Sequence, residues 1–397
     1  MRILLVVFAL LLALPPSAAA TNLSDAASAL APGTFVELTG MNGLNNGAIF
    51  EPVGCAPGAG PDITEYANKA VWNPVSKRFQ FAGISHVPCG GDNARAVYYD
   101  DASNTWGNLP QSGLMSGQND PRHTYDQNSL DPTTGMHFVT NYNSITTFVL
   151  ANNASSWSST NRPGACCQVA TSDTFFPTFS GGGRMFHWDA SRGLWGYRPS
   201  DGNWTQYATV ATFSSTCDAG AGRNCRAITG GESSPLSAYS TVCNCMLFGG
   251  GSIAGAPLYK MDTAGVITQM SLSGAPASFQ VSNPGSSAGQ GVSMAVDPVS
   301  GFLITISDTG AMKQFDPTAG SQGTWTNLPA TVPAFFKTAG GAQDKLISAG
   351  IPDYGVILYV KISGSAGAAG STRVYLYKHR PSQPGARPAA PFNVTTQ

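Results

Sequence analysis

Residues 128–141 read NSLDPTTGMHFVTN, which is a short strand, an Asp-Pro-x-x-Gly turn and a second strand. Proline fixes φ at such a turn, and glycine tolerates positive φ. The same plan recurs as AVWNPVSKRFQFAG (70–83) and SMAVDPVSGFLITIS (293–307). Three further stretches keep both strands and change the turn, namely FFPTFSGGGRMFHWD (175–189), AYSTVCNCMLFGG (238–250) and LISAGIPDYGVILYV (346–360). A strand–turn–strand unit is therefore repeated along the chain.

A second hairpin follows each unit, with an aromatic strand, a polar turn and often a tryptophan. The tryptophans give the period, because Trp106 and Trp157 are 51 residues apart and Trp204 follows 47 residues later. Trp325 comes two periods after Trp204, with Ile267 at the intermediate position. A four-stranded unit that repeats about every 50 residues is typical of a propeller blade, since one such sheet cannot bury both faces alone. The sequence predicts an all-β fold, a single β-propeller of about six four-stranded blades.

The last unit lacks a tryptophan-type fourth strand, and PGTFVELTG (32–40) is the strand expected to complete it. Closure between the two ends of the chain would leave no exposed edge in the ring. A seventh blade hidden in 41–68 or 206–231 is one alternative, and a pair of stacked β-sheets is another. We expect the propeller to span residues 21–381, followed by a Pro-rich disordered tail or linker at 382–397.

Two outer hairpins, YYDDASNTW (98–106) and FDPTAGSQGTW (315–325), resemble the kelch repeat, whose outer hairpin reads roughly Tyr-Asp-x-x-x-Asn-x-Trp. The resemblance covers most of the chain and is one of architecture, to the kelch-like, galactose-oxidase-type β-propeller superfamily. It implies that the loops entering the innermost strands share one face with the loops joining second and third strands. That face usually binds the ligand, and the Asn/Asp-Pro turns lie on the opposite side.

The first twenty residues, MRILLVVFALLLALPPSAAA, have one positive charge, a short apolar run and small residues at the end. This is the layout of a signal peptide, with a retained membrane anchor as the alternative. Because no second apolar segment follows, we expect a secreted, extracellular or periplasmic protein without a membrane span after cleavage. The 22 acidic residues nearly balance the 21 basic ones, and no basic stripe indicates a nucleic-acid partner.

Eight cysteines in an exported chain predict structural disulfides before metal sites. Zinc would require two pairs with Cys-x-x-Cys-like spacing, and the spacings in this chain are different. The candidate pairings are Cys217 with Cys225, Cys55 with Cys89, and the pair Cys166-Cys167 with Cys243-x-Cys245.

The polar stretch directly before residue 128 would head the inner strand of the second blade. Its residues Arg122, His123 and Tyr125 should line the mouth of the central channel. His86 and Arg95, from the second-to-third-strand loop of the first blade, would reach the neighbouring sector. The other expected ligand contacts are Tyr66 of the first blade, His187 and Asp189 of the third and Glu232 of the fourth.

A histidine and a tyrosine near an arginine suit β-elimination from a uronic-acid polysaccharide. The arginine neutralises the carboxylate and so acidifies the C5 proton, which His123 or Tyr125 then removes. Hydrolysis would need two carboxylates at a defined separation, which Asp126, Asp189 and Glu232 could supply. We therefore expect recognition or processing of a polysaccharide or glycan, with a polysaccharide lyase favoured over a glycoside hydrolase.

The residues also allow other functions. No cofactor is predicted, although His86, His123 and His187 could hold a divalent metal because separate blades converge on the axis. The copper radical oxidases of this architecture need a Tyr-Cys crosslink with two Tyr and two His ligands, a set that the sequence does not place. Polar residues at a hydrated channel mouth are also common without catalysis. A non-catalytic extracellular binding or surface-display module is therefore the competing hypothesis.

Overall fold

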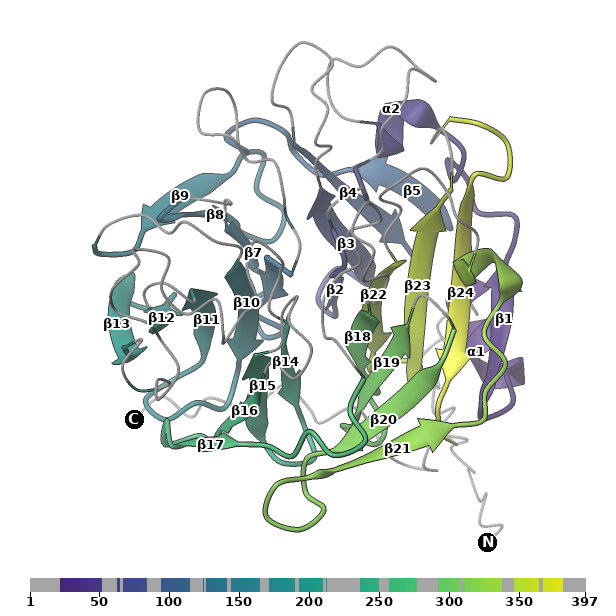
Figure 1. Ribbon diagram of the computed structural model, residues 1–397. Coiled ribbons are helices and arrows are strands. Elements are labelled where there is room, and N and C mark those ends of the chain that lie inside the picture. Colours follow the sequence, from purple (N-terminus) through teal and green to yellow (C-terminus); the bar gives the residue numbers. More distant parts are fainter. Residues whose placement is uncertain are drawn as a thin grey trace, which may run out of the picture.

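In the computed structural model the strands form six four-stranded antiparallel sheets within the described residues. Their innermost strands contact one another in sequence around a closed ring (Figure 1). The predicted six-bladed propeller is thereby confirmed. The described residues are 22–51, 63–64, 67–83, 94–114, 124, 126–140, 144–164, 171–189, 193–209, 212, 236–249, 257–276, 292–307, 310–337, 346–363 and 367–380.

The blades of the first half of the ring each run in chain order from an innermost to an outermost strand. Blade 1 comprises β2 (Val71–Asn73), β3 (Arg78–Gly83), β4 (Arg95–Asp100) and β5 (Thr105–Asn108). Blade 2 comprises β6 (Asn128–Leu130), β7 (His137–Thr140), β8 (Thr146–Leu150) and β9 (Ser158–Asn161). Blade 3 comprises β10 (Thr171–Phe176), β11 (Arg184–Asp189), β12 (Gly193–Arg198) and β13 (Asn203–Ala208).

The second half of the ring has the same inner-to-outer order, except that its last blade ends on a strand from near the beginning of the chain. Blade 4 comprises β14 (Leu236–Ser240), β15 (Cys245–Gly249), β16 (Leu258–Met261) and β17 (Ile267–Gln269). Blade 5 comprises β18 (Val292–Val296), β19 (Leu303–Ser307), β20 (Met312–Asp316) and β21 (Thr324–Leu328). Blade 6 comprises β22 (Leu346–Ile351), β23 (Val356–Ile362), β24 (Thr372–Lys378) and β1 (Thr34–Leu38).

Blade 6 joins the two ends of the described chain. Strand β1 pairs antiparallel with β24, from Thr34 opposite Lys378 to Leu38 opposite Val374. This pairing confirms that the stretch 32–40 completes the last blade. The described helices are α1 (Asn22–Ala29), which lies beside β1 in Figure 1, α2 (Gly47–Phe50) and the 3₁₀-helix η2 (Ala334–Lys337). None of them is long and apolar enough to cross a membrane.

The Asp-Pro turn of blade 2 shows why its sequence closes a hairpin. The carboxylate of Asp131 accepts bonds from the Thr133 amide (2.9 Å) and the Thr134 hydroxyl (2.7 Å). The Gly135 amide then donates to the Asp131 carbonyl (2.8 Å), and Gly135 has a φ of +73°. Such a left-handed position favours glycine, which has no Cβ to clash with the backbone. The corresponding left-handed residues in four other blades are Lys77, Asn244, Gly301 and Gly355.

In blade 4 a disulfide between Cys243 and Cys245 closes the turn that lacks a proline. Between them, Asn244 accepts a hydrogen bond from the Tyr239 hydroxyl (2.7 Å). These two cysteines therefore pair with each other rather than with Cys166-Cys167. The six cysteines outside the described residues are Cys55, Cys89, Cys166, Cys167, Cys217 and Cys225.

Three of the recurrent tryptophans share one contact, in which the indole N–H donates to the preceding blade. The acceptors are Pro110 O for Trp157 (2.7 Å), Thr160 Oγ1 for Trp204 (3.1 Å) and Ser271 O for Trp325 (3.1 Å). The period of about 50 residues in the sequence therefore marks a repeated tether between blades.

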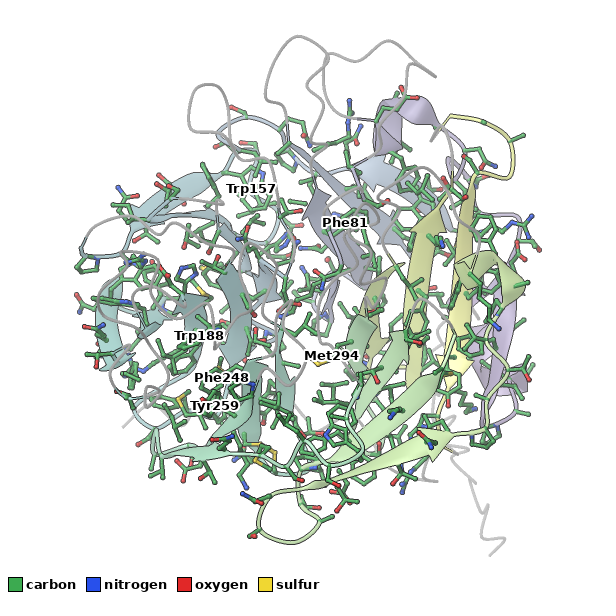
Figure 2. All side chains as sticks on the ribbon, viewed as in Figure 1. Phe81, Trp157, Trp188, Phe248, Tyr259 and Met294 are labelled. Atoms are coloured by element: carbon green, nitrogen blue, oxygen red, sulfur yellow. A yellow bond between two sulfur atoms is a disulfide. The ribbon has the colours of Figure 1, made fainter. Side chains whose placement is uncertain are left out.

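Apolar layers between neighbouring blades form most of the core. Between blades 3 and 4, the fully buried rings of Trp188 and Phe248 meet edge to face, with centroids 5.4 Å apart. Phe248 also stacks on Tyr259, and Figure 2 shows the three side chains close together. Burial of such rings stabilises the fold by about 25 cal/mol per Å² of apolar surface.

Candidate functional site

A buried ion pair bridges the ring at its axis. Lys69, two residues before β2 in blade 1, places its Nζ 3.1 Å from Asp126 Oδ2 of blade 2, and the two side chains are 13% and 3% exposed. The same ammonium donates to the carbonyl of Asp173 in blade 3 (2.5 Å) and to that of Ser237 in blade 4 (2.7 Å). The bore is therefore crossed by a charged side chain at this level.

Asp126 is fixed by further donors besides Lys69. Its Oδ2 accepts the Ser172 hydroxyl (2.6 Å) and the Ser237 amide (2.8 Å). Burial raises the pKa of Asp126 above its ordinary value, while the ammonium and these two donors oppose that shift by favouring the carboxylate. The carboxylate thus belongs to a packed polar cluster that ties blades 1 to 4 together.

The layer between blades 2 and 3 is polar in one half and apolar in the other. Strand register places Asp173 opposite His187 and His187 opposite Trp195, so these side chains share one face of blade 3. Asp173, His187 and Trp195 lie in the half of the layer where β10 begins, which we call the polar half-layer. The other half, where β10 ends, is apolar and contains Phe138, Val149, Phe175 and Met185.

Asp173 and His187 form a buried dyad in this polar half-layer. The imidazole Nδ1–H donates to Asp173 Oδ1 at 2.7 Å, and the side chains of Asp173 and His187 are 0% and 1% exposed respectively. A carboxylate can only accept at this position, so Nδ1 carries the proton when the ring is neutral. His187 Nε2 and Asp173 Oδ2 have no hydrogen-bond partner among the described residues.

A second buried ion pair lies next to the dyad. Arg162 follows β9 of blade 2, and its Nη2 donates to Asp189 Oδ2 of blade 3 at 2.6 Å, with both side chains almost fully buried. Its guanidinium also lies 5.7 Å from the centre of the Trp195 ring. Arg162 Nε and Trp195 Nε1 are buried donors for which the described part of the chain supplies no acceptor.

The half-layer therefore combines two unpartnered acceptors with two unpartnered donors. Buried polar groups in proteins are normally hydrogen-bonded, and exceptions of this kind indicate a bound water, an ion or a functional site. An imidazole oriented through Nδ1 by a carboxylate presents the lone pair of Nε2, which is the arrangement of a general base. The N–H groups of Arg162 and Trp195 suit an anionic oxygen.

Three of the residues expected at the site from the sequence fall within the described part. His187 and Asp189 lie two residues apart on the face of blade 3 just described. Arg95 begins β4 in blade 1, where its Nε donates to the carbonyl of Glu51 (2.5 Å) and its Nη1 to that of Ala48. Burial lowers the pKa of Arg95, and the Glu51 carboxylate opposes this shift. The expected residues outside the described part are Tyr66, His86, Arg122, His123, Tyr125 and Glu232.

Sequence reasoning missed Lys69, Asp173 and Arg162. One available signal was Asp173, an acidic residue inside the otherwise uncharged strand sequence TSDTFF. Lys69 stands directly before an apolar strand that the repeats place at the axis. No cluster of three His, Cys, Asp or Glu side chains forms among the described residues. Two members of the metal set considered from the sequence, His86 and His123, lie outside them.

A separate surface hollow of about 810 Å³ lies beside β1. Its lining is mostly apolar and comes from residues 33–35 and 329–334, and Lys337 is the one ionisable residue in it. Among its described lining residues the hollow has no pair of ionisable groups, so the polar half-layer between blades 2 and 3 is the better candidate site.

No protein-family model and no curated protein matches this chain. Among solved structures, the chain is similar to the Malassezia sympodialis allergen Mala s 1, with 10% identity, a TM-score of 0.43, and coverage of 82% of this chain and 96% of that one. It is also similar to a GH74 enzyme of Niastella koreensis, with 15% identity, a TM-score of 0.43, and coverage of 79% of this chain and 42% of that one. U3-55K is similar at 8% identity and a TM-score of 0.44, with coverage of 79% and 95% respectively. These likenesses concern the overall fold, and no function follows from them.

Proposed function

We propose that this chain is an exported carbohydrate-processing β-propeller, and that its reaction is β-elimination from a uronate polysaccharide. The observation that carries the proposal is the buried Asp173–His187 dyad, whose Nε2 has no partner among the described residues. Export rests on the signal-peptide layout of the first twenty residues.

In this reaction His187 Nε2 takes the C5 proton of the uronate, and Asp173 stabilises the imidazolium that forms. The electron pair of the C5–H bond becomes the C4=C5 double bond, and the C4–O bond breaks with its electrons leaving on oxygen. The unpartnered N–H groups of Arg162 and Trp195 are the donors offered to the substrate carboxylate, since hydrogen bonds to an ionised acceptor are the stronger ones. His123 and Tyr125, which flank Thr124 in the sequence, remain the predicted donors to the leaving oxygen.

A specific observation also favours the second candidate, a non-catalytic extracellular binding module. His187 and Asp173 are almost inaccessible, and Lys69 crosses the bore. In such a module the dyad is a structural pair, and glycan binding relies on the surface around it.

Incubation of the protein with a panel of uronate polysaccharides, and with a neutral glucan as substrate control, separates the two. A lyase releases an unsaturated uronate that absorbs in the ultraviolet. His187→Gln and Asp173→Asn should each reduce this rate about 100-fold or more, because each removes the oriented base. His379→Gln is the matched control, since that histidine lies at the end of β24 in blade 6.

Full activity in His187→Gln would exclude the dyad as the base. Loss of activity in His123→Ala and Tyr125→Phe would then assign the base to the segment that precedes the inner strand of blade 2. Glycan binding without product, unchanged in all variants, would establish the non-catalytic module instead.

A further inference from the structure

We propose that the polar cluster at the axis of the ring is a monovalent-cation site whose resident cation is the ammonium of Lys69. This inference is independent of any catalytic role. It concerns what holds the blades together where ring closure brings their inner strands into contact.

The ammonium lies among oxygens from three different blades. Its closest acceptors are the Asp126 carboxylate and the carbonyls of Asp173 and Ser237. Thr174 Oγ1 lies 3.2 Å away and Ser237 Oγ 3.5 Å. An ammonium has three N–H donors, so it meets more oxygens than it can bond at once. A shell with an excess of oxygen ligands around one positive charge is what a bare monovalent cation also requires.

The charge of the shell selects a monovalent ion. Asp126 contributes one negative charge, and the other ligands are neutral carbonyls and hydroxyls. One positive charge therefore balances the cluster, whereas a divalent ion would leave a buried excess charge. Uncompensated buried charge is strongly destabilising, and this is why either partner alone is unfavourable there.

The oxygen shell is also held without the lysine. Asp126 accepts from the Ser237 amide, and the Ser172 hydroxyl contacts both Asp126 and the Ser237 hydroxyl. The backbone of β10 is fixed as well, because the Asp173 amide donates to the Asp126 carbonyl at 2.9 Å. Removal of the ammonium would therefore leave a preformed oxygen shell in which the Asp126 carboxylate has lost its counter-charge.

The remaining two blades complete the layer at the same level. Lys69 forms a parallel bridge with Ser348 of blade 6, and the Ser348 hydroxyl lies 2.9 Å from that of Ser293 in blade 5. Since blade 4 stands opposite blade 1 in a ring of six, the lysine spans the bore to reach Ser237. Four blades thus meet at the ammonium, and the bridge and the serine pair link the other two blades to them.

Chemical rescue of Lys69→Ala tests the proposal, because the truncation removes a group equivalent to n-propylammonium. The variant is unfolded and refolded in n-propylammonium, ammonium or potassium chloride, or in tetramethylammonium chloride at the same ionic strength. In tetramethylammonium the melting temperature should fall by about 10 °C relative to wild type, because a buried charge has lost its partner. n-Propylammonium, ammonium and potassium should each restore the melting temperature in a saturable manner. If the variant does not fold without a cation, they should restore the refolding yield instead.

Lys77→Ala is the matched control, since Lys77 forms an exposed ion pair with Asp353. It should respond identically to all four salts. The double variant Lys69→Met/Asp126→Asn removes both charges, so it should be more stable in tetramethylammonium than Lys69→Ala and insensitive to the choice of cation. An unchanged melting temperature in Lys69→Ala, an equal response to all cations, or cation-selective rescue of the double variant would each overturn the proposal.

Discussion

At the scale of single residues, the side-chain amide of Asn128 bonds to the backbone of the neighbouring blade as a paired strand would. Its Oδ1 accepts from the Ala82 amide (2.8 Å) and its Nδ2 donates to the Ala82 carbonyl (3.1 Å), so blade 2 pairs with the backbone of blade 1. The same Oδ1 lies 3.1 Å from His137 Nε2. Because Oδ1 can only accept, the neutral His137 ring carries its proton on Nε2.

His137 should make the stability of the protein depend on pH. It is fully buried, and desolvation lowers its pKa from 6.5 to about 3. Between these two values the unfolded chain binds a proton that the folded chain excludes. The free energy of unfolding therefore falls as the pH decreases from about 6.5, by about 1.4 kcal/mol per pH unit for this one group.

Denaturant unfolding of wild type and His137→Gln between pH 4 and pH 8 measures this contribution. Glutamine keeps an N–H donor for Asn128 but does not titrate. The two stability curves should run parallel above pH 7 and converge as the pH falls toward 4. Parallel curves over the whole range would show that His137 is not the group responsible.

Individual buried charges were the part of the site least accessible to sequence reasoning. Strand alternation indicates that Asp173 and His187 can share a sheet face, but it does not indicate which neighbouring blade covers that face. The pairing of Lys69 with Asp126 joins residues 57 positions apart, and it depends on how two neighbouring blades pack against each other. No local pattern contains that information.

At the scale of elements, the inner hairpins were predictable because their turns carry the chemistry in a few adjacent residues. An Asx side chain caps the turn, proline sets φ and a residue with positive φ ends it. In blade 4 the turn has Thr241 at the position of the proline, and a disulfide between Cys243 and Cys245 spans its left-handed residue Asn244. The tethering tryptophans made the outer hairpins recognisable in the same way.

Asp131 provides a direct test of the capping role. Asp131→Ala removes the acceptor of both the Thr133 amide and the Thr134 hydroxyl, and it should lower the free energy of unfolding by about 1–2 kcal/mol. Asp131→Asn keeps Oδ1, so it should lower the free energy of unfolding by less than half of that amount. Chemical denaturation of both variants checks this, and equal losses would mean that the turn does not depend on the cap.

At the scale of the whole molecule, the fold depends on a strand contributed from near the beginning of the chain. The sequence predicted this closure because the last repeat lacks its fourth strand and the stretch 32–40 has the pattern to supply it. Leu38 of β1 and Leu23 of α1 are both buried in the core shared by blades 1 and 6.

Deletion of residues 22–38 should therefore destabilise the entire ring, by at least about 3 kcal/mol, since it removes buried apolar side chains and exposes the edge of β24. The exposed edge should also cause self-association, visible by size-exclusion chromatography. Deletion of 382–397 retains every described strand and serves as the control. A monomeric, wild-type-like melting curve for the first deletion would show that closure by β1 is dispensable.

Closure by β1 also dictates the order in which the protein can mature. Blades 1 to 5 each consist of consecutive segments and can assemble as the chain is synthesised. Blade 6 cannot form until β24 has been synthesised, and β1 has no strand partner until then. The first of the described strands to be made is therefore among the last to pair. Chaperones or proteases acting during that interval would meet an open arc with two unprotected ends.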